Sequence, residues 1–197
     1  SQAGRVEYVY IFNIGFKILK NFFSNLDNIN VEIQFDDILK IEEHRELSIK
    51  RKSLGDSDLI PEVNSRVIFD NKRLDSSIRL KGERMTHFKD KKNSSYRVRL
   101  DNDNYIFGVK KFSLQKPRVR NYIYEWIYYE MTGDFGLIKP TYNFINLEIN
   151  GSDQGLYVFE EAFGKELVER NNRRNGPIFG FNDDMINFST NFKIDQN

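Results

Sequence analysis

The sequence contains no cysteine and only two histidines, His44 and His87, among its 197 residues. The lack of cysteine excludes disulfides, thiolate metal sites and thiol nucleophiles. The two histidines are far apart and show no HExxH-like spacing, which argues against a histidine-based metal site. We therefore assign no metal ligand from the sequence, and the cellular compartment stays open.

Neither charge sign is in clear excess, because 30 lysine and arginine residues stand against 29 aspartate and glutamate residues. Non-specific nucleic-acid binding requires a broad positive surface, so we expect no nucleic-acid partner. Long hydrophobic runs are also lacking. The apolar stretch at residues 8–16 is too short to span a bilayer and leads into Lys17 and Lys20. We predict a buried strand or helix start there, with a trimmed anchor or signal segment as the alternative, and no membrane span in this chain.

The first part of the chain predicts one strand followed by one helix. Apolar and polar residues alternate from Val31 to Phe35, as in a half-buried strand. Residues 38–50 have an apolar side and a charged side, which is typical of an amphipathic helix. We place an N-terminal strand-helix unit and its linker at residues 1–64.

Strands dominate the middle of the chain. Alternation predicts a hairpin over residues 67–81 and further antiparallel strands at 96–100 and 105–114. Pro117 precedes an aromatic-rich helix predicted over residues 118–131.

The last part predicts a second hairpin and a short helix. Asn150-Gly151 is a hairpin signal between strands at residues 144–149 and 156–159. A helix is predicted over residues 163–172.

Basic residues and carboxylates supply the candidate site. The loop of residues 82–95, entered from Lys81 and containing Arg84, could grip an anion through side chains, or could be an exposed hairpin tip. A lysine on a strand and Glu125 on the following helix could form an ion pair that positions the lysine for nucleotide phosphates. Aromatic residues at helical spacing are more often core than ligand contacts, so the same helix could be a core element. Glu160 and Glu161 end the second hairpin, where they could lie at a hinge or cap the next helix.

Five segments, taken in order, resemble the CotH kinase family, which is named for a bacterial spore coat protein. They are residues 78–83 (IRLKGE), 96–100 (YRVRL), 107–115 (FGVKKFSLQ), 117–126 (PRVRNYIYEW) and 150–161 (NGSDQGLYVFEE). The resemblance implies an atypical kinase that binds ATP with Mg²⁺ or Mn²⁺ and phosphorylates protein Ser or Thr hydroxyls. It also favours a location at the bacterial cell envelope or surface.

The fold expected from this resemblance is of the α+β class. It is a mainly antiparallel sheet with one packed aromatic helix, like the N-lobe of a protein-kinase-like fold, preceded by the strand-helix unit. The N-lobe is expected at residues 65–162. Residues 163–197 are expected to begin a C-lobe that is cut short.

The resemblance also implies roles for individual residues. Lys110 resembles the phosphate-positioning strand lysine, with Lys111 as the second choice, and Glu125 resembles its helix partner. Lys81 and Arg84 would contact the nucleotide from above, and Glu160 and Glu161 would lie at the hinge.

The family's catalytic aspartates normally follow the hinge by many tens of residues, and Asp183 and Asp184 come too soon after it. We therefore assign no catalytic or metal-binding residue, and we expect the chain alone to be inactive although its parent is an ATP-dependent protein kinase. The alternative is a non-catalytic spore-coat or surface module that binds another protein. A sugar or small-molecule kinase also stays open.

Overall fold

The computed structural model of the protein describes residues 26–55, 57–82, 84–174 and 176–177. The chain divides into two compact units, the first ending at Phe163 and the second beginning at Gly164. The apolar stretch at residues 8–16 and the pair Asp183 and Asp184 lie outside the described residues. Among the helices of the described part, none is long and apolar enough to cross a membrane.

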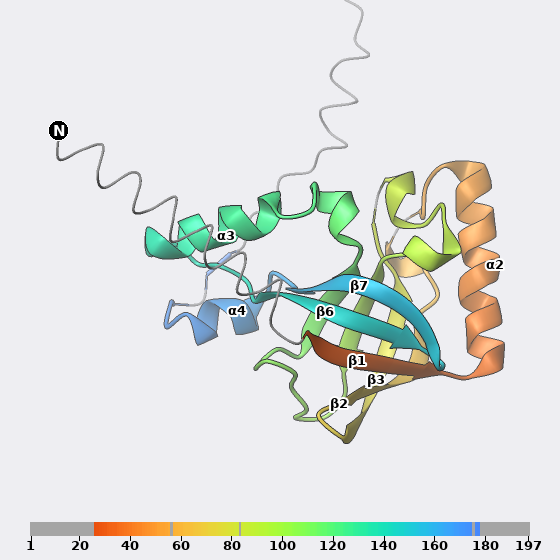
Figure 1. The fold of residues 1–197 in the computed structure, drawn as a ribbon, viewed down its shortest axis with the longest axis horizontal. Helices are drawn as coiled ribbons and strands as arrows, with labels where there is room; N and C mark the ends of the chain where they lie inside the picture. Colours follow the sequence, from red (N-terminus) through yellow and green to blue (C-terminus); the bar gives the residue numbers. More distant parts are fainter. Residues whose placement is uncertain (1–25, 56, 83, 175, 178–197) are drawn as a thin grey trace, which may run out of the picture. The chain divides into compact units, whose positions relative to one another are not determined.

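Strands of the first unit form a closed barrel with the neighbour order β1-β2-β3-β4-β5-β7-β6 (Figure 1). The strands are β1 (Asp27–Ile33), β2 (Val63–Phe69), β3 (Lys72–Leu80), β4 (Tyr96–Leu100), β5 (Lys111–Gln115), β6 (Tyr142–Ile149) and β7 (Ser152–Glu161). All neighbouring pairs are antiparallel except β1 and β6, which run parallel and close the barrel.

The predicted fold class, an α+β N-lobe preceded by a separate strand-helix unit, is therefore wrong. Strand β1 does not precede the sheet but completes it, since Val31 lies opposite Val67 of β2 and Ile149 of β6. The sequence predicted a strand here over residues 31–35, whereas β1 spans Asp27–Ile33 and Phe35 already begins the following helix. The parallel pairing of β1 with a strand far along the chain leaves no local turn signal, so barrel closure could not be seen in the sequence.

Inward side chains from every strand fill the barrel. They are apolar and at most 1% exposed: Ile29, Val31, Val67, Ile78, Leu80, Val98, Leu100, Phe112, Leu114, Ile145, Leu147, Tyr157 and Phe159. The rings of Phe112 and Phe159 stack with their centroids 4.2 Å apart. Because side chains alternate across a strand, the intervening residues point to the outside of the barrel.

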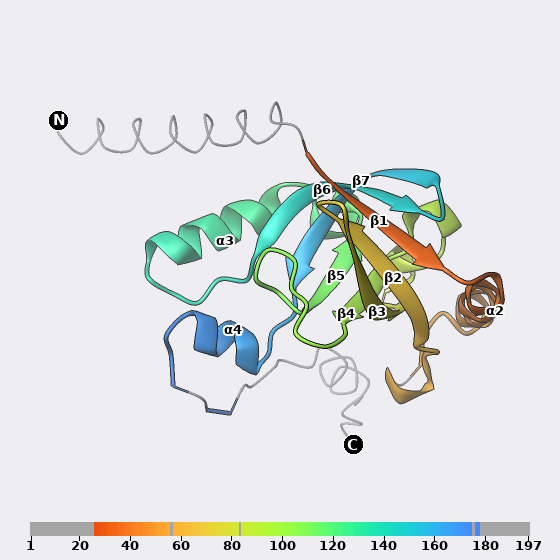
Figure 2. The same ribbon diagram turned by 90° about the horizontal axis from the view of Figure 1, so that it is seen from below.

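Helix α2 (Phe35–Arg51) follows β1 directly and contacts β2 and β3, whereas α3 (Tyr124–Asp134) lies at the other end of the barrel, along β6 and β7 (Figure 2). Short 3-10 helices connect the strands: η1 (Ser57–Leu59), η2 (Met85–His87), η3 (Lys91–Asn93) and η4 (Pro117–Arg120). In the second unit, α4 spans Lys165–Arg170.

Two predicted elements start later than expected. The helix predicted from residue 118 is the 3-10 helix η4, and α3 begins only at Tyr124, because Asn121 and Tyr122 have left-handed φ angles of 53° and 62°. The strand predicted from residue 105 begins at Lys111, because Ile106 and Val109 bridge across a tight turn.

Helix α3 packs on the outside of the barrel. Trp126 and Tyr129 contact Tyr142 of β6 and Val158 of β7 in a cluster separate from the barrel interior. This packing places α3 over the outward side chains of β7, and so positions the site described next.

Candidate functional site

The strand register aligns polar side chains across the outside of the barrel. Arg79 of β3, Arg97 of β4, Ser113 of β5, Glu160 of β7 and Tyr142 of β6 are successive cross-strand partners. Their strand neighbours point into the barrel, so these five residues project outward in one row. The row runs from the open surface of β3 to the strands that α3 covers.

Lys81 is two positions after Arg79, outside this row, and contacts the row through a hydrogen bond to Glu160. Its Nζ donates to Glu160 Oε2 over 3.0 Å, and Gln115 Nε2 donates to the same oxygen over 2.9 Å. The other oxygen, Oε1, accepts from the Tyr129 hydroxyl over 3.4 Å. Only 17% of the Lys81 side chain and 8% of the Glu160 side chain are exposed, so this is a nearly buried ion pair.

A second carboxylate, Glu125 of α3, lies beside this pair. Its Oε2 is buried, makes no hydrogen bond with any described residue, and is 3.5 Å from Arg120 Nε. The hydroxyl of Tyr142 is likewise buried and without a hydrogen-bond partner in the described part of the chain. We call Lys81, Gln115, Glu125, Tyr129 and Glu160 the polar cluster.

Burial determines the protonation equilibria of the polar cluster. It lowers the pKa of Lys81, and Glu160 opposes this effect by favouring the charged ammonium. It raises the pKa of Glu125, and the charge on Glu160 raises that pKa further. The cluster therefore holds the Lys81 ammonium next to Glu160, and the charge on Glu160 disfavours the ionisation of Glu125.

The loop of residues 82–95 packs back onto the sheet beside Lys81. Gly82 has a φ of +116°, and a Cβ atom there would lie 2.3 Å from Cγ of His87. His87 is buried, and its Nδ1 is 3.0 Å from the Ser95 hydroxyl. Burial, reinforced by the charge on Lys81, lowers the pKa of His87 to about 4. Arg84 of the same loop is exposed.

The structure brings together three of the residues selected from the sequence: Lys81, Glu160 and Glu125. The interaction of Glu125 with Lys81 is electrostatic, and the ion-pair partner of Lys81 is Glu160.

The structure places Lys110 and Lys111 elsewhere. Lys110 lies in the turn before β5, and Lys111 is exposed at the start of β5, opposite Arg99. Neither side chain forms an ion pair with another described residue. Glu161 contributes to the end of the barrel, where its Oε2 accepts from the Thr141 backbone N–H over 2.9 Å.

Sequence reasoning missed Gln115, Tyr129, Arg97 and Arg120. Arg97 occupies an outward position of a predicted strand, so the alternation there indicated where its side chain points, whereas Gln115 lies one residue past the strand predicted over residues 105–114. Tyr129 was interpreted as core, and the structure shows that it is both core and a donor to Glu160.

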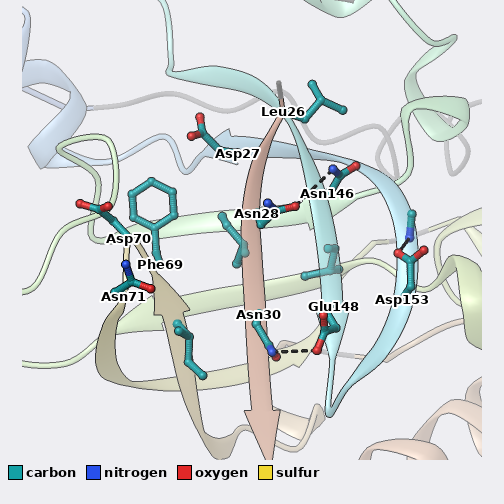
Figure 3. A pocket seen from close by; sticks show the side chains of 14 residues that line it. Leu26, Asp27, Asn28, Asn30, Phe69, Asp70, Asn71, Asn146, Glu148 and Asp153 are labelled. Atoms are coloured by element: carbon teal, nitrogen blue, oxygen red, sulfur yellow. Dashed lines mark hydrogen bonds between the residues drawn. The ribbon is translucent and has the colours of Figure 1, made fainter. Parts of the chain in front are cut away.

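A wide groove lies on another part of the barrel surface (Figure 3). It has a volume of about 1030 Å³ and is lined by amides and carboxylates of β1 and β6, including Asn30, whose Nδ2 donates to Glu148 Oε1 over 2.9 Å. None of the residues selected from the sequence lines this groove. Within the described residues, no group of three or more His, Asp or Glu side chains is arranged to hold a metal ion.

The family comparison covers the end of β3, the strands β4 to β7 and the polar cluster. The model of the family described as CotH kinase protein matches residues 78–196. The chain belongs to the CotH family. The resemblance seen in the sequence motifs is thereby confirmed.

A curated relative supports the same assignment. This CotH family chain is 24% identical over 146 residues to the inner spore coat protein H of Bacillus subtilis (strain 168). The alignment covers 74% of the chain but only 39% of that protein, so the chain spans about two fifths of its relative's length.

Proposed function

We propose that the chain is the nucleotide-binding part of an ATP-dependent protein kinase, with Lys81 as the lysine that contacts the phosphates. The observation that carries this proposal is the nearly buried ion pair between Lys81 and Glu160, with its 3.0 Å contact. Membership of a family described as CotH kinase protein supports it independently.

The ion pair is better explained by function than by stability. A buried pair often stabilises a fold no more than well-packed apolar residues of similar volume would. Here, Glu160 accepts from Gln115 and Tyr129 as well, so the carboxylate is fixed and holds the Lys81 ammonium at one place. Phosphoryl transfer depends mainly on such positioning and on charge stabilisation.

The surrounding charges fit an anionic ligand. Arg79 and Arg97 project from β3 and β4 on the outside of the barrel, and Lys81 follows directly after β3; we call these three residues the basic strand face. The Nε of Arg97 is buried and has no hydrogen-bond partner among the described residues. Phosphate oxygens are suitable acceptors for such donors.

ATP bound with Mg²⁺ or Mn²⁺ would supply the γ-phosphoryl group for transfer to a protein Ser or Thr. We propose that Lys81 holds and orients the phosphates, whereas Glu160, Gln115 and Tyr129 hold Lys81. We assign no described residue to the transfer step, so transfer itself is proposed for the full-length protein.

Thermal denaturation of the chain with and without ATP and MgCl₂ or MnCl₂ tests this proposal. At a nucleotide concentration of ten times Kd, binding should stabilise the fold by about 1.4 kcal/mol, which corresponds to a rise in Tm of roughly 3–6 °C for a chain of this size. Lys81→Met should remove the shift. Lys110→Met is the matched control and should retain it.

The opposite pattern, in which Lys110→Met removes the shift and Lys81→Met does not, would return the phosphate role to Lys110. No shift with either metal ion in the unaltered chain would contradict nucleotide binding. Circular dichroism of each variant shows whether it is folded, which separates lost binding from lost structure.

A protein-binding module of the spore coat is the second candidate function. The exposed face of α3 favours it, because Tyr124, Tyr128 and Met131 lie on one side of the helix and Phe135 follows directly after it, all 40–75% exposed. In the full-length protein, Lys81→Met separates the two functions. A kinase loses activity in this variant, whereas a binding module keeps its partner.

A further inference from the structure

The described neighbours of Arg97 leave part of its charge and of its hydrogen-bonding capacity without a partner. It lies directly opposite Arg79 in the β3–β4 pair. Like charges opposite each other on antiparallel strands destabilise the pair. Burial, together with the charge on Arg79, lowers the pKa of Arg97, and only the more distant Glu160 opposes this effect.

The guanidinium also has a donor that the described residues leave unused. Its Nε is buried without a hydrogen-bond partner. A buried donor without an acceptor is unfavourable. Glu160, the carboxylate in the same row, already accepts from Lys81, Gln115 and Tyr129.

Arg99 provides a contrast on the same strand and the same outward face. It is two residues further along β4, and 59% of its side chain is exposed. One of its guanidinium nitrogens lies 3.9 Å from Glu62 Oε1. Arg99 therefore has both solvent and a carboxylate nearby, whereas Arg97 Nε has neither.

An anion bound on the outside of β3 and β4 would give Arg97 a hydrogen-bond acceptor and an opposite charge. It would accept from Nε and reduce the repulsion between Arg97 and Arg79, and arginine suits phosphate because its donors form a planar fork. Lys81, the residue after the end of β3, is two positions beyond Arg79 and about 7 Å from it. Long side chains at that spacing can converge on neighbouring phosphates of one ligand.

We propose that Arg97 is a second anion-binding point, which contacts a phosphate group other than the one held by Lys81. The site would then select polyphosphates over monophosphates. This inference rests on the proposed function in naming ATP as the polyphosphate and Lys81 as the contact to the other phosphate, whereas the anion-binding point itself follows from the geometry of the basic strand face.

Isothermal titration calorimetry of the full chain with inorganic tripolyphosphate, ATP and AMP tests the proposal. Arg97→Gln should weaken the binding of tripolyphosphate and ATP about tenfold or more, as expected for the loss of a charge-assisted hydrogen bond, and should leave AMP affinity nearly unchanged. Arg99→Gln, the matched control, should have little effect on any of the three. Arg97→Lys, which keeps the charge but loses the fork, should be intermediate.

Tripolyphosphate affinity that is unchanged in Arg97→Gln would overturn the proposal, as would no tripolyphosphate binding by the unaltered chain. An equal loss in Arg99→Gln would also overturn it, because the effect would then be one of general charge. Tripolyphosphate binding that depends on Arg97, combined with no ATP binding, would support the anion-binding point and reject the nucleotide function. Circular dichroism establishes that each variant is folded, and Arg97→Lys provides the test if Arg97→Gln does not fold.

Discussion

The inner and outer surfaces of the barrel wall differ in how their buried residues interact. Strand β5 shows both surfaces within five residues, since Phe112 and Leu114 point inward while Ser113 and Gln115 point outward. All four side chains are buried. The inner pair packs against many apolar neighbours, whereas Gln115 on the outer surface donates to one carboxylate, that of Glu160.

The two surfaces therefore contribute differently to the stability of the fold. Apolar packing in the interior is distributed over every strand, so it serves the fold as a whole. The polar cluster instead concentrates charge at one place, where desolvation offsets much of the electrostatic attraction. Its residues are better understood as a positioned group than as a stabilising one.

The largest expected effect is on the inner surface. Phe112→Ala removes a ring that stacks on Phe159 at 4.2 Å and leaves a cavity in the barrel. The free energy of unfolding should fall by about 3–5 kcal/mol. Urea unfolding followed by circular dichroism measures it, with the milder Phe112→Leu as control. A loss below about 1 kcal/mol would mean that the interior is not close-packed around this ring.

On the outer surface, a single substitution and a double one should differ. Glu160→Leu leaves the Lys81 ammonium without its carboxylate and should reduce the free energy of unfolding by about 3 kcal/mol, the lower end of the range for a buried pair, because 17% of the Lys81 side chain is exposed. Adding Lys81→Met removes the unpaired charge, so the double variant should return to within about 1 kcal/mol of the unaltered chain. Urea unfolding of the single and double variants measures both values. A double variant as unstable as Glu160→Leu would show that the polar cluster is structural.

Local patterns in the sequence predicted most of the strands. Alternation identified β4, and the Asn150-Gly151 signal identified the β6–β7 hairpin, where these residues adopt φ angles of 48° and 75°. What the sequence could not predict was the neighbour of each strand. Barrel closure by β1 and the insertion of β5 between β4 and β7 are long-range pairings.

The ion pair was harder to predict for the same reason. Lys110 was paired with Glu125 because a strand and the following helix are adjacent in sequence. Lys81 and Glu160 are 79 positions apart and meet only because β5 brings β7 next to the sheet of β3 and β4. The residue types were visible in the sequence, but their pairing depends on the strand order.

The smallest expected effect concerns His87, which packs where the loop of residues 82–95 meets Lys81. Its pKa in the folded protein is lowered from 6.5 to about 4, so in this range the unfolded chain takes up a proton that the folded protein does not. The contribution of neutral His87 to the free energy of unfolding is fully present above pH 6.5 and is lost as the pH falls towards 4. Allowing for partial solvent screening, the loss at pH 5 should be about 1–2 kcal/mol.

Urea midpoints measured from pH 7 to pH 5 check this expectation. His87→Gln can keep a hydrogen bond to Ser95 but cannot take up the proton, so its stability should fall less steeply over this range than that of the unaltered chain. His44→Gln removes the other histidine and serves as the control. Equal slopes for His87→Gln and the unaltered chain would show that the acid sensitivity arises elsewhere, and that the loop beside Lys81 stays packed when His87 is protonated.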